Sequence, residues 1–320
     1  MAHKKMGEAS FVEAFLRPEV GVNRRLERIE RMIEWAPLQD LVKPVRSGAW
    51  GRPSYPPLAM LKALLLQRWY SLSDEGLEEA LSDRLSFRRF CGFALDDETP
   101  DAKTLCRFRL ALVAAELPER LFAELDRQLT AKGLFVKSGT LIDASLIEAD
   151  VKRPPKDQGE VSERDPDAGF TRRGQKSFFG YKAHIAVDQG TDLIRGAILT
   201  GADLGDSLAA DALIQGDEAA VYADKAYDSQ ARREALTAAG IVDALMYRRH
   251  ARRREPAWQK WMNVALTPIR CQVERLFGLM KRSYGYIRVR YRGLARNRAQ
   301  LLLMCMAINL RRADRLLLAG

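Results

Sequence analysis

Three acidic residues of this chain, Asp143, Asp224 and Glu274, occupy positions where carboxylates could act together. Asp143 lies in the run LIDASLI, where two apolar residues stand on either side of it, and Glu274 directly follows Val273 in a helical pattern. An unpaired carboxylate in apolar surroundings is costly, so both settings favour an acid that has a partner. Taken one at a time, each acid is better explained as a turn residue, a cap or part of a solvated helix face than as a catalytic group.

Three carboxylates without histidine or cysteine form a hard oxygen site, which suits Mg²⁺ or Mn²⁺ better than zinc. Two such ions about 3.5 to 4 Å apart can activate an attacking oxygen on one side of a phosphodiester and stabilise the leaving oxygen on the other. The three acids therefore predict phosphoryl transfer with Mg²⁺ or Mn²⁺, and with two ions.

Other metal chemistry is poorly supported by the composition. The chain has 4 cysteines and 3 histidines, with no C-x-x-C pair and no two histidines one helical turn apart. This pattern argues against a zinc site and fits a reduced, cytoplasmic protein.

The elements that must position the acids follow from the apolar periodicity of residues 134–320. Asp143 lies on a first strand, Asp224 ends a fourth strand, and Glu274 lies on the helix after a fifth strand. In a mixed sheet the first and fourth strands can be neighbours, and a covering helix can bring its glutamate to them. The predicted fold class is α/β (α+β), a mixed five-stranded sheet flanked by helices. The predicted strands are 139–150, 178–188, 192–200, 219–223 and 241–246, and the predicted helices are 206–215, 229–239, 257–282 and 294–318.

Residues 1–133 form a helical region by the same criteria, with apolar helices expected at 58–66, 77–85, 105–113 and 119–131. Thr99-Pro100-Asp101 predicts a helix start, and Gly133 is well placed to end a helix. Residues 152–177 are polar and rich in proline and glycine, which predicts an exposed, mobile loop. The first residues lack the apolar run of a signal peptide, and the apolar run 301–310 is too short for the roughly 20 residues that span a bilayer, so no membrane association is expected.

Positive charge is concentrated around Glu274. The formal net charge is +10 and the pI is near 9.5, which favours a polyanionic partner such as nucleic acid or an acidic membrane surface. Residues 244–298 contain 15 Lys or Arg against 2 Asp or Glu. Arginines at 288, 290 and 292 alternate with apolar and aromatic residues, which predicts a stripe that follows phosphates. The alternative is a solvated edge strand that charge protects from aggregation.

At these residues the chain resembles the DDE-type insertion-sequence transposases, specifically the insertion-sequence-five group of bacteria. LIDASLI around Asp143 and YADKAYDS around Asp224 match the first two acidic motifs of that family. Arg270, Glu274 and Lys281 reproduce its R-x3-E-x6-K helix motif, while Thr267 stands where the family often has tyrosine. GADLGDS at 201–207 resembles a weaker motif of the family.

The resemblance implies a ribonuclease H-like catalytic domain over 134–320 and a helical region over 1–133 that binds the ends of a mobile element. It implies an enzyme that cuts at the ends of an insertion sequence and joins the freed 3′-hydroxyl to target DNA. Asp143, Asp224 and Glu274 would be the catalytic, metal-binding residues. The expected partner is double-stranded DNA, both terminal inverted repeats and target, bound by a homodimer or larger assembly in the bacterial cytoplasm, at the nucleoid. A DNA-binding relative without catalysis, or a nuclease without strand transfer, are the alternatives.

The expected DNA contacts are basic residues near the acids together with one tyrosine: Arg270, Lys281, Lys225, Tyr227, Arg275, Arg288, Arg290, Arg292, Arg252 and Arg253. In the helical region the candidates for contact with the element's ends are Lys62, Arg68, Arg84, Arg88, Arg89, Arg107 and Arg109.

Overall fold

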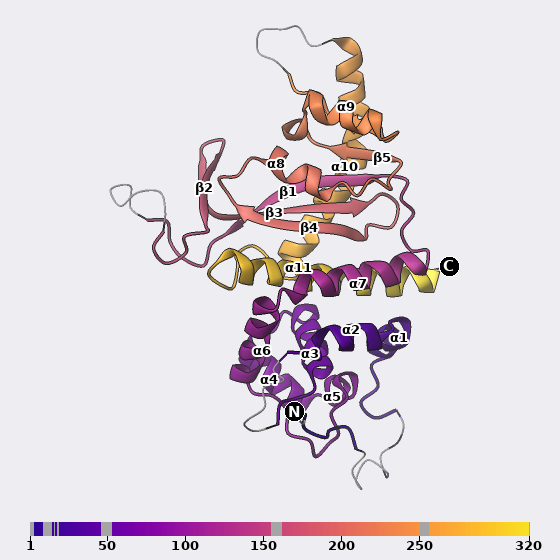
Figure 1. The fold of residues 1–320 in the computed structure, drawn as a ribbon, viewed down its shortest axis with the longest axis vertical. Coiled ribbons are helices and arrows are strands. Elements are labelled where there is room, and N and C mark those ends of the chain that lie inside the picture. Colours follow the sequence, from indigo (N-terminus) through magenta and orange to yellow (C-terminus); the bar gives the residue numbers. More distant parts are fainter. Residues whose placement is uncertain are drawn as a thin grey trace. The chain divides into compact units, whose positions relative to one another are not determined.

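The computed structural model describes residues 3–8, 15, 17, 19–45, 53–154, 162–249 and 256–319. The chain divides into two compact units, one of residues 1–132 with 302–320 and one of residues 133–301 (Figure 1). The first boundary lies beside the predicted one after residue 133. The second boundary differs from the prediction, because residues 302–320 belong to the unit of the N-terminal helices.

The first unit is built from helices. Their bounds are α1 Arg24–Met32, α2 Trp35–Val42, α3 Pro57–Trp69, α4 Asp74–Asp83, α5 Leu85–Cys91, α6 Ala102–Ala114 and α7 Leu117–Ala131, to which the later part of α11 (Leu294–Ala319) is added.

Side-chain caps explain where several of these helices begin. The side chain of Ser73 accepts a hydrogen bond from the backbone N–H of Gly76 at the start of α4. Asp101 accepts the N–H of Thr104 at 2.7 Å at the start of α6, which confirms the helix start predicted there. At the other end of α7, Gly133 has a φ of +69°, a conformation that favours glycine, so the predicted helix end is confirmed too.

The core of the first unit surrounds α3, which buries residues on all of its sides. The later part of α11 completes that core. Trp69 on α3 donates its indole N–H to the carbonyl oxygen of Ala307 at 2.7 Å, and Arg28 forms an ion pair with Asp314 at 2.6 Å. These contacts join segments more than 200 residues apart, which is why local sequence patterns did not predict them.

The second unit holds a mixed sheet with helices on its faces. Its elements are β1 Thr140–Glu148, β2 Gly169–Arg173, β3 Lys176–Asp188, β4 Ile194–Gly201, α8 Asp206–Ala210, η3 Asp211–Leu213, β5 Ala220–Ala223, η4 Lys225–Tyr227, α9 Gln230–Ala238, β6 Val242–Leu245, α10 Ala257–Ser283 and the start of α11. Helix α8 is shorter than the predicted helix over 206–215, because η3 follows it and places Leu213 in the core.

The sheet has six strands where five were predicted. Five of them form the series β4-β3-β1-β5-β6, in which β1 pairs antiparallel with β3 and parallel with β5. The sixth strand, β2, pairs with the start of β3 inside the segment predicted as a mobile loop, residues 152–177. That prediction is wrong for residues 169–173 and 176–177, which form a strand pair in which Phe170 lies opposite Phe179. The polar residues around them along the chain form no strand pattern. Residues 155–161 of the segment lie outside the described residues.

Opposite faces of the sheet are covered by different helices. Val221 and Ala223 of β5 lie in a core cluster with Ala210 of α8 and Leu236 of α9. Tyr222, between them on β5, packs against the cluster that contains Leu266 of α10. Because neighbouring residues of a strand point to opposite faces, α10 covers one face, and α8 and α9 cover the other (Figure 1).

Within the described residues, no helix is both long and apolar enough to cross a lipid bilayer.

Candidate active site

The pairing of β1 with β5 brings the two aspartates together. The strands are parallel, with Ile142 opposite Ala223, so Asp143 and Asp224 are the next residues on adjacent strands. The Asp143 side chain is only 17% exposed, whereas Asp224 lies at the open end of β5 with a side chain that is 40% exposed. The prediction that the first and fourth predicted strands, 139–150 and 219–223, lie side by side is therefore confirmed, because they correspond to β1 and β5.

Helix α10 places its residues over the same pair of strands. The guanidinium of Arg270 lies among three carboxylates: 3.8 Å from Asp143 Oδ2, 3.4 Å from Asp224 Oδ1 and 3.6 Å from Glu274 Oε1. Arg270 and Glu274 are one helical turn apart, so they share a face of α10. The three acids thus converge from three separate elements on one cation.

The burial of Asp143 changes its acidity. Removal from water raises the pKa of its carboxyl to about 6, and the negative charges of Asp224 and Glu274 act in the same direction. A hydrogen bond from the N–H of Ala144 and the charge of Arg270 lower the pKa and partly offset that rise. Because three carboxylates lie close together here, an added positive charge would stabilise their ionised forms.

The donor set fits a divalent cation of the oxygen-preferring kind. All three side chains offer carboxylate oxygens, the ligands that Mg²⁺ and Mn²⁺ prefer. In the described part of the chain, no three acidic, histidine or cysteine side chains stand at metal-binding spacing, and the Arg270 guanidinium lies among these acids. Asp143, Asp224 and Glu274 could hold a metal once Arg270 turns toward another anion.

Tyr227, expected beside the scissile strand, lies inside the protein. It is 1% exposed and belongs to the core cluster on the α8 and α9 side of the sheet. Burial raises the pKa of its hydroxyl, and the charges of Asp143, Asp206 and Asp224 raise it further. Among the described residues its hydroxyl has no hydrogen-bond partner. Tyr227 therefore lies in the core of the sheet and not on the surface.

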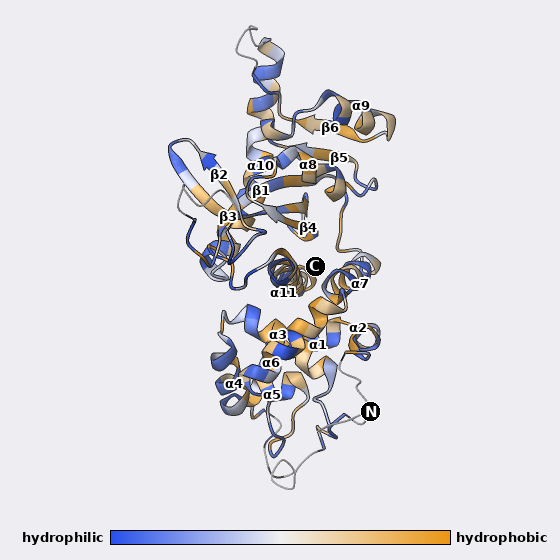
Figure 2. Ribbon diagram, turned by 60° about the vertical axis from the view of Figure 1, so that its left-hand side comes forward, coloured by the Kyte–Doolittle hydropathy of each residue, from blue (hydrophilic) through white to orange (hydrophobic). Residues whose placement is uncertain are grey.

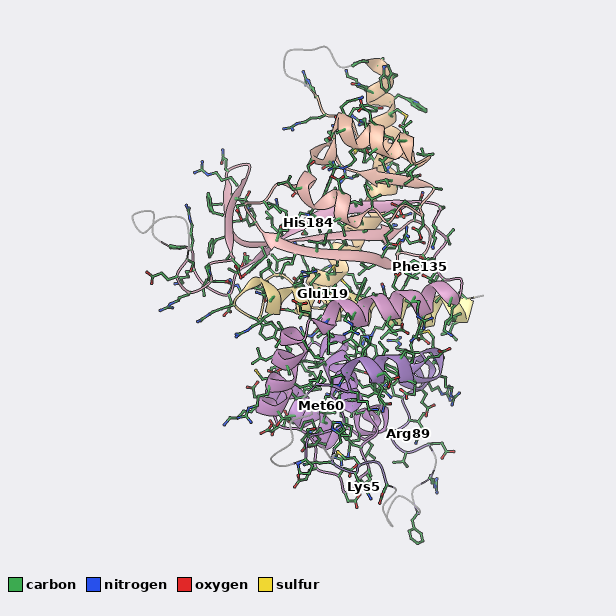
Figure 3. The ribbon with its side chains drawn as sticks, in the orientation of Figure 1. Lys5, Met60, Arg89, Glu119, Phe135 and His184 are labelled. Atoms are coloured by element: carbon green, nitrogen blue, oxygen red, sulfur yellow. The ribbon has the colours of Figure 1, made fainter. Side chains whose placement is uncertain are left out.

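A partly buried polar cluster lies on the other side of the sheet from Glu274. The Lys182 Nζ atom is 2.7 Å from Asp206 Oδ1, and His184 Nε2 lies 3.0 Å from Thr200 Oγ1. His184, fully buried on β3 (Figure 3), is paired with Ala144 in the register. Its removal from water lowers its pKa to about 4, so it is neutral near pH 7. Sequence reasoning missed these residues, although GADLGDS contains Asp206.

Comparison with known families decides the identity of this arrangement. Residues 134–310, more than half of the chain, match the family described as "Transposase DDE domain". The chain belongs to the DDE transposase family. Residues 15–110 match a second family, described as "Transposase domain (DUF772)".

The DDE transposase has the mixed sheet and helical N-terminal region expected of it, so the predicted ribonuclease H-like fold is confirmed. It is a DNA transposase, and its family implies dependence on a divalent metal ion. The chain is also similar to a solved structure titled "Cryo-EM structure of piggyBac transposase synaptic complex with hairpin DNA". The aligned region covers 89% of this chain and 71% of that chain, with a TM-score of 0.43 and 12% sequence identity.

Most of the basic residues expected at the transposase's DNA lie on the surface. Lys225, Arg275, Arg290 and Arg292 are exposed, and Lys281 is half-buried on α10. Arg288 is exposed and donates to Glu148 Oε2 at 2.9 Å, and its backbone neighbours pair with the end of β1. Arg252 and Arg253 lie outside the described residues.

In the helical unit the structure separates surface arginines from structural ones. Lys62, Arg68, Arg88 and Arg109 are each at most 7% exposed, so the expectation that they touch DNA is wrong for this conformation. They are buried because each binds an internal partner, such as Glu30 for Lys62 and Asp74 for Arg109. Arg84, Arg89 and Arg107 remain exposed.

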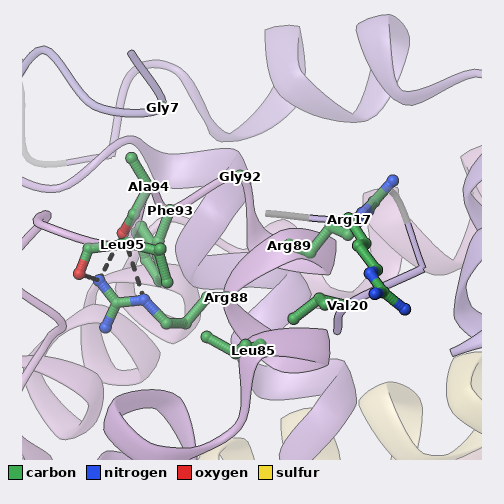
Figure 4. A pocket seen from close by; sticks show the side chains of 10 residues that line it. All are labelled: Gly7, Arg17, Val20, Leu85, Arg88, Arg89, Gly92, Phe93, Ala94 and Leu95. Carbon is green, nitrogen blue, oxygen red and sulfur yellow. Dashed lines mark hydrogen bonds between the residues drawn. The ribbon is translucent and has the colours of Figure 1, made fainter. Parts of the chain in front are cut away.

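The helical unit also has a pocket of about 360 Å³, lined by residues that include Arg17, Arg88 and Arg89 (Figure 4). The guanidinium of Arg88 donates to the backbone oxygen of Leu95 in the wall at 3.0 Å and to that of Asp97, outside the wall, at 2.7 Å. Arg88 therefore helps to form the wall of this pocket, and its guanidinium already donates hydrogen bonds to backbone oxygens of its own chain.

Proposed function

We propose that this transposase cuts at the ends of an insertion sequence and joins the freed 3′-hydroxyl to target DNA, with Asp143, Asp224 and Glu274 as catalytic residues. The observation that carries the proposal is the convergence of these carboxylates, from β1, the end of β5 and α10, on the Arg270 guanidinium. Membership of the insertion-sequence-five group rests on the sequence motifs around the three acids.

The three carboxylates would hold Mg²⁺ or Mn²⁺, as two ions. When bound, such ions activate the attacking oxygen and stabilise the leaving oxygen of a phosphodiester. Asp143 is the most buried of the three acids and would anchor the site, while Asp224 and Glu274 border solvent, where a phosphate can approach.

Arg270 has a second role in this proposal. A phosphate entering the site brings negative charge, and a guanidinium binds phosphate with two parallel hydrogen bonds. Arg270 would leave the carboxylates for the phosphate, so that one side chain first offsets part of the negative charge of the acids and then orients the substrate. Lys225, Lys281 and Arg275 would bind neighbouring phosphates.

The partner is double-stranded DNA at terminal inverted repeats and then at the target. The helical unit would bind the ends, and a homodimer or larger assembly would hold two ends together. These assignments follow from the family's reaction, which acts on both ends of one element.

The test uses Glu274→Gln, which keeps the shape of the side chain and removes its charge. Cleavage of DNA that carries the element's ends should fall by about 10²- to 10³-fold in Mg²⁺, the scale of losing one electrostatic stabiliser, while binding of the same DNA is retained. Glu234→Gln, on the exposed face of α9, is the matched control and should cleave normally.

Full cleavage by Glu274→Gln would overturn the assignment of that residue. Cleavage by the unmodified protein that persists in EDTA would overturn metal dependence. Joining of labelled ends to a plasmid separates a transposase of this kind from a nuclease that only cuts.

A further inference from the structure

A two-stranded ribbon projects from the second unit, residues 133–301. It consists of β2 (Gly169–Arg173) and the first residues of β3, joined by a turn at Gly174 and Gln175. Arg172 and residues 174–177 are exposed, and β2 is an edge strand whose strand partner is β3 (Figure 1). Figure 2 shows the end of this ribbon coloured as hydrophilic.

The base of the ribbon is firmly held. Tyr181 on β3 donates its hydroxyl to Asp165 Oδ1 at 2.6 Å, and the N–H of Gly293 donates to the same oxygen at 3.0 Å. Gly169 lies so close to Asp203 that an added Cβ would come within 1.8 Å of its carboxylate. A ribbon with a fixed base and an exposed end can present its side chains in a defined direction.

Both faces of the ribbon carry positive charge. Residues 169–187 contain no acidic residue, and Arg172 and Lys176 stand on either side of the turn. Arg172 shares a face with Phe170, and Lys176 shares the opposite face with Thr171, since strand neighbours alternate. The Arg153 guanidinium lies 3.7 Å from the centre of the Phe170 ring, which adds a second cation to the first face.

We propose that this β2–β3 ribbon enters the major groove of the double-stranded DNA whose phosphate is cut at the acidic site, with Arg172 and Lys176 contacting the phosphates on its two sides. The major groove is about 12 Å wide and accepts a two-stranded ribbon. A ribbon inside a groove meets a phosphate chain on each side, which is why positive charge on both faces fits this partner. The inference rests on the proposed function for the place of the cut.

The register of the sheet sets the distance between the ribbon and the acids. Ser177, opposite Arg172, precedes Ile185, opposite Asp143, by eight residues along β3. At about 3.3 Å per residue this is at most about 26 Å. Since base pairs of duplex DNA are about 3.4 Å apart, the ribbon contacts DNA within about 8 base pairs of the cut phosphate.

Edge protection is the competing explanation, because charged residues on an exposed edge strand prevent pairing with other chains. A negative charge would protect the edge as well as a positive one. Only phosphate contact requires the positive sign, so reversal of the charge distinguishes the two explanations.

The experiment measures binding of the full-length protein to a fluorescein-labelled random-sequence duplex of about 30 base pairs, in EDTA, across a range of salt concentrations. Arg172→Ala with Lys176→Ala should weaken binding about tenfold and reduce the slope of log affinity against log salt by about 2. Arg172→Glu with Lys176→Glu should weaken binding further. Arg172→Lys with Lys176→Arg should bind as the unmodified protein does, with an unchanged melting temperature for all variants.

Two exposed residues of α6 and α7, Lys103 and Arg120, provide the charge-matched control. Their double change to glutamate lowers the net charge by the same amount and should leave affinity within about twofold of normal. Equal loss in this control, or normal binding by the Glu pair at 172 and 176, would overturn the proposal.

Hydroxyl-radical footprinting on end-bearing duplex locates the contact. The unmodified protein should protect the groove at a place within about 8 base pairs of the cut, and the alanine pair should lose that protection alone. If the ends are never cut while the variants still lose binding, the proposed function fails and the ribbon's contact with DNA stands. If the ends are cut and the alanine pair keeps both binding and protection, the ribbon proposal fails and the catalytic assignment stands.

Discussion

At the scale of single residues, Arg270 is the group on which the acidic site depends. Its guanidinium lies within 4 Å of Asp143, Asp224 and Glu274, so part of their negative charge is offset by a side chain that can also bind phosphate. A lysine carries the same charge but lacks the planar fork that reaches several oxygens at once.

Arg270→Ala is therefore expected to slow single-turnover cleavage of end-bearing DNA by about 10²-fold, the scale of one lost electrostatic stabiliser, with Arg270→Lys intermediate. The alanine variant should also gain more thermal stability from added Mg²⁺ than the unmodified protein does, because three carboxylates are left without their cation. Arg282→Ala, near the end of the same helix, is the control. Normal cleavage by Arg270→Ala would contradict the role of this residue.

At the scale of elements, an ion pair ties α4 to α6 in the helical unit. Both carboxylate oxygens of Asp74 accept hydrogen bonds from Arg109, which is 4% exposed, and Gln67 on α3 adds a third at 2.6 Å. Burial opposes ionisation of Asp74, but the hydrogen bonds and charge of Arg109 outweigh it and lower the pKa of Asp74.

Asp74→Asn should reduce the free energy of unfolding by about 3 kcal/mol near pH 7, because it leaves Arg109 buried without a counter-charge. The folded-state pKa lies below the unfolded value of about 3.9, so the stabilisation is complete above that pH and is lost as the pH falls through the folded-state value. Urea unfolding should show the gap between variant and unmodified protein narrowing in acid. A change of similar size in Asp83→Asn, an exposed residue of the same helix, would argue against the ion pair as the cause.

At the scale of the whole molecule, the distribution of charge matters more than its total. Residues 244–298 carry 15 basic against 2 acidic residues, while the entire chain carries only +10. Of the arginines in this segment, Arg290 and Arg292 are exposed beside the end of β1, where Val289 hydrogen-bonds to the carbonyl of Glu148.

Arg290→Ala with Arg292→Ala should reduce the salt slope of duplex binding by about 2, uniformly across DNA sequences, because phosphate contacts carry no base information. Fluorescence anisotropy at several salt concentrations measures this slope. An unchanged slope would favour the alternative that these arginines only protect an edge of the sheet.

Sequence by itself determined the family motifs, the three acids and the approximate bounds of the longer helices, such as α7, α10 and α11. Caps such as Asp101 and terminators such as Gly133 act on residues within one turn, so their signal is local and readable. The concentration of charge around Glu274 is likewise a property of composition.

Only the tertiary structure decided which side chains surround the acids and which are hidden. The burial of Tyr227, the place of Arg270 among three carboxylates and the pairing of β2 with β3 all depend on contacts between elements distant in the chain. The same holds for residues 302–320, whose core contacts reach back to α1 and α3. Periodicity shows that a residue will be buried, but the partner that buries it is chosen by the packing of the whole unit.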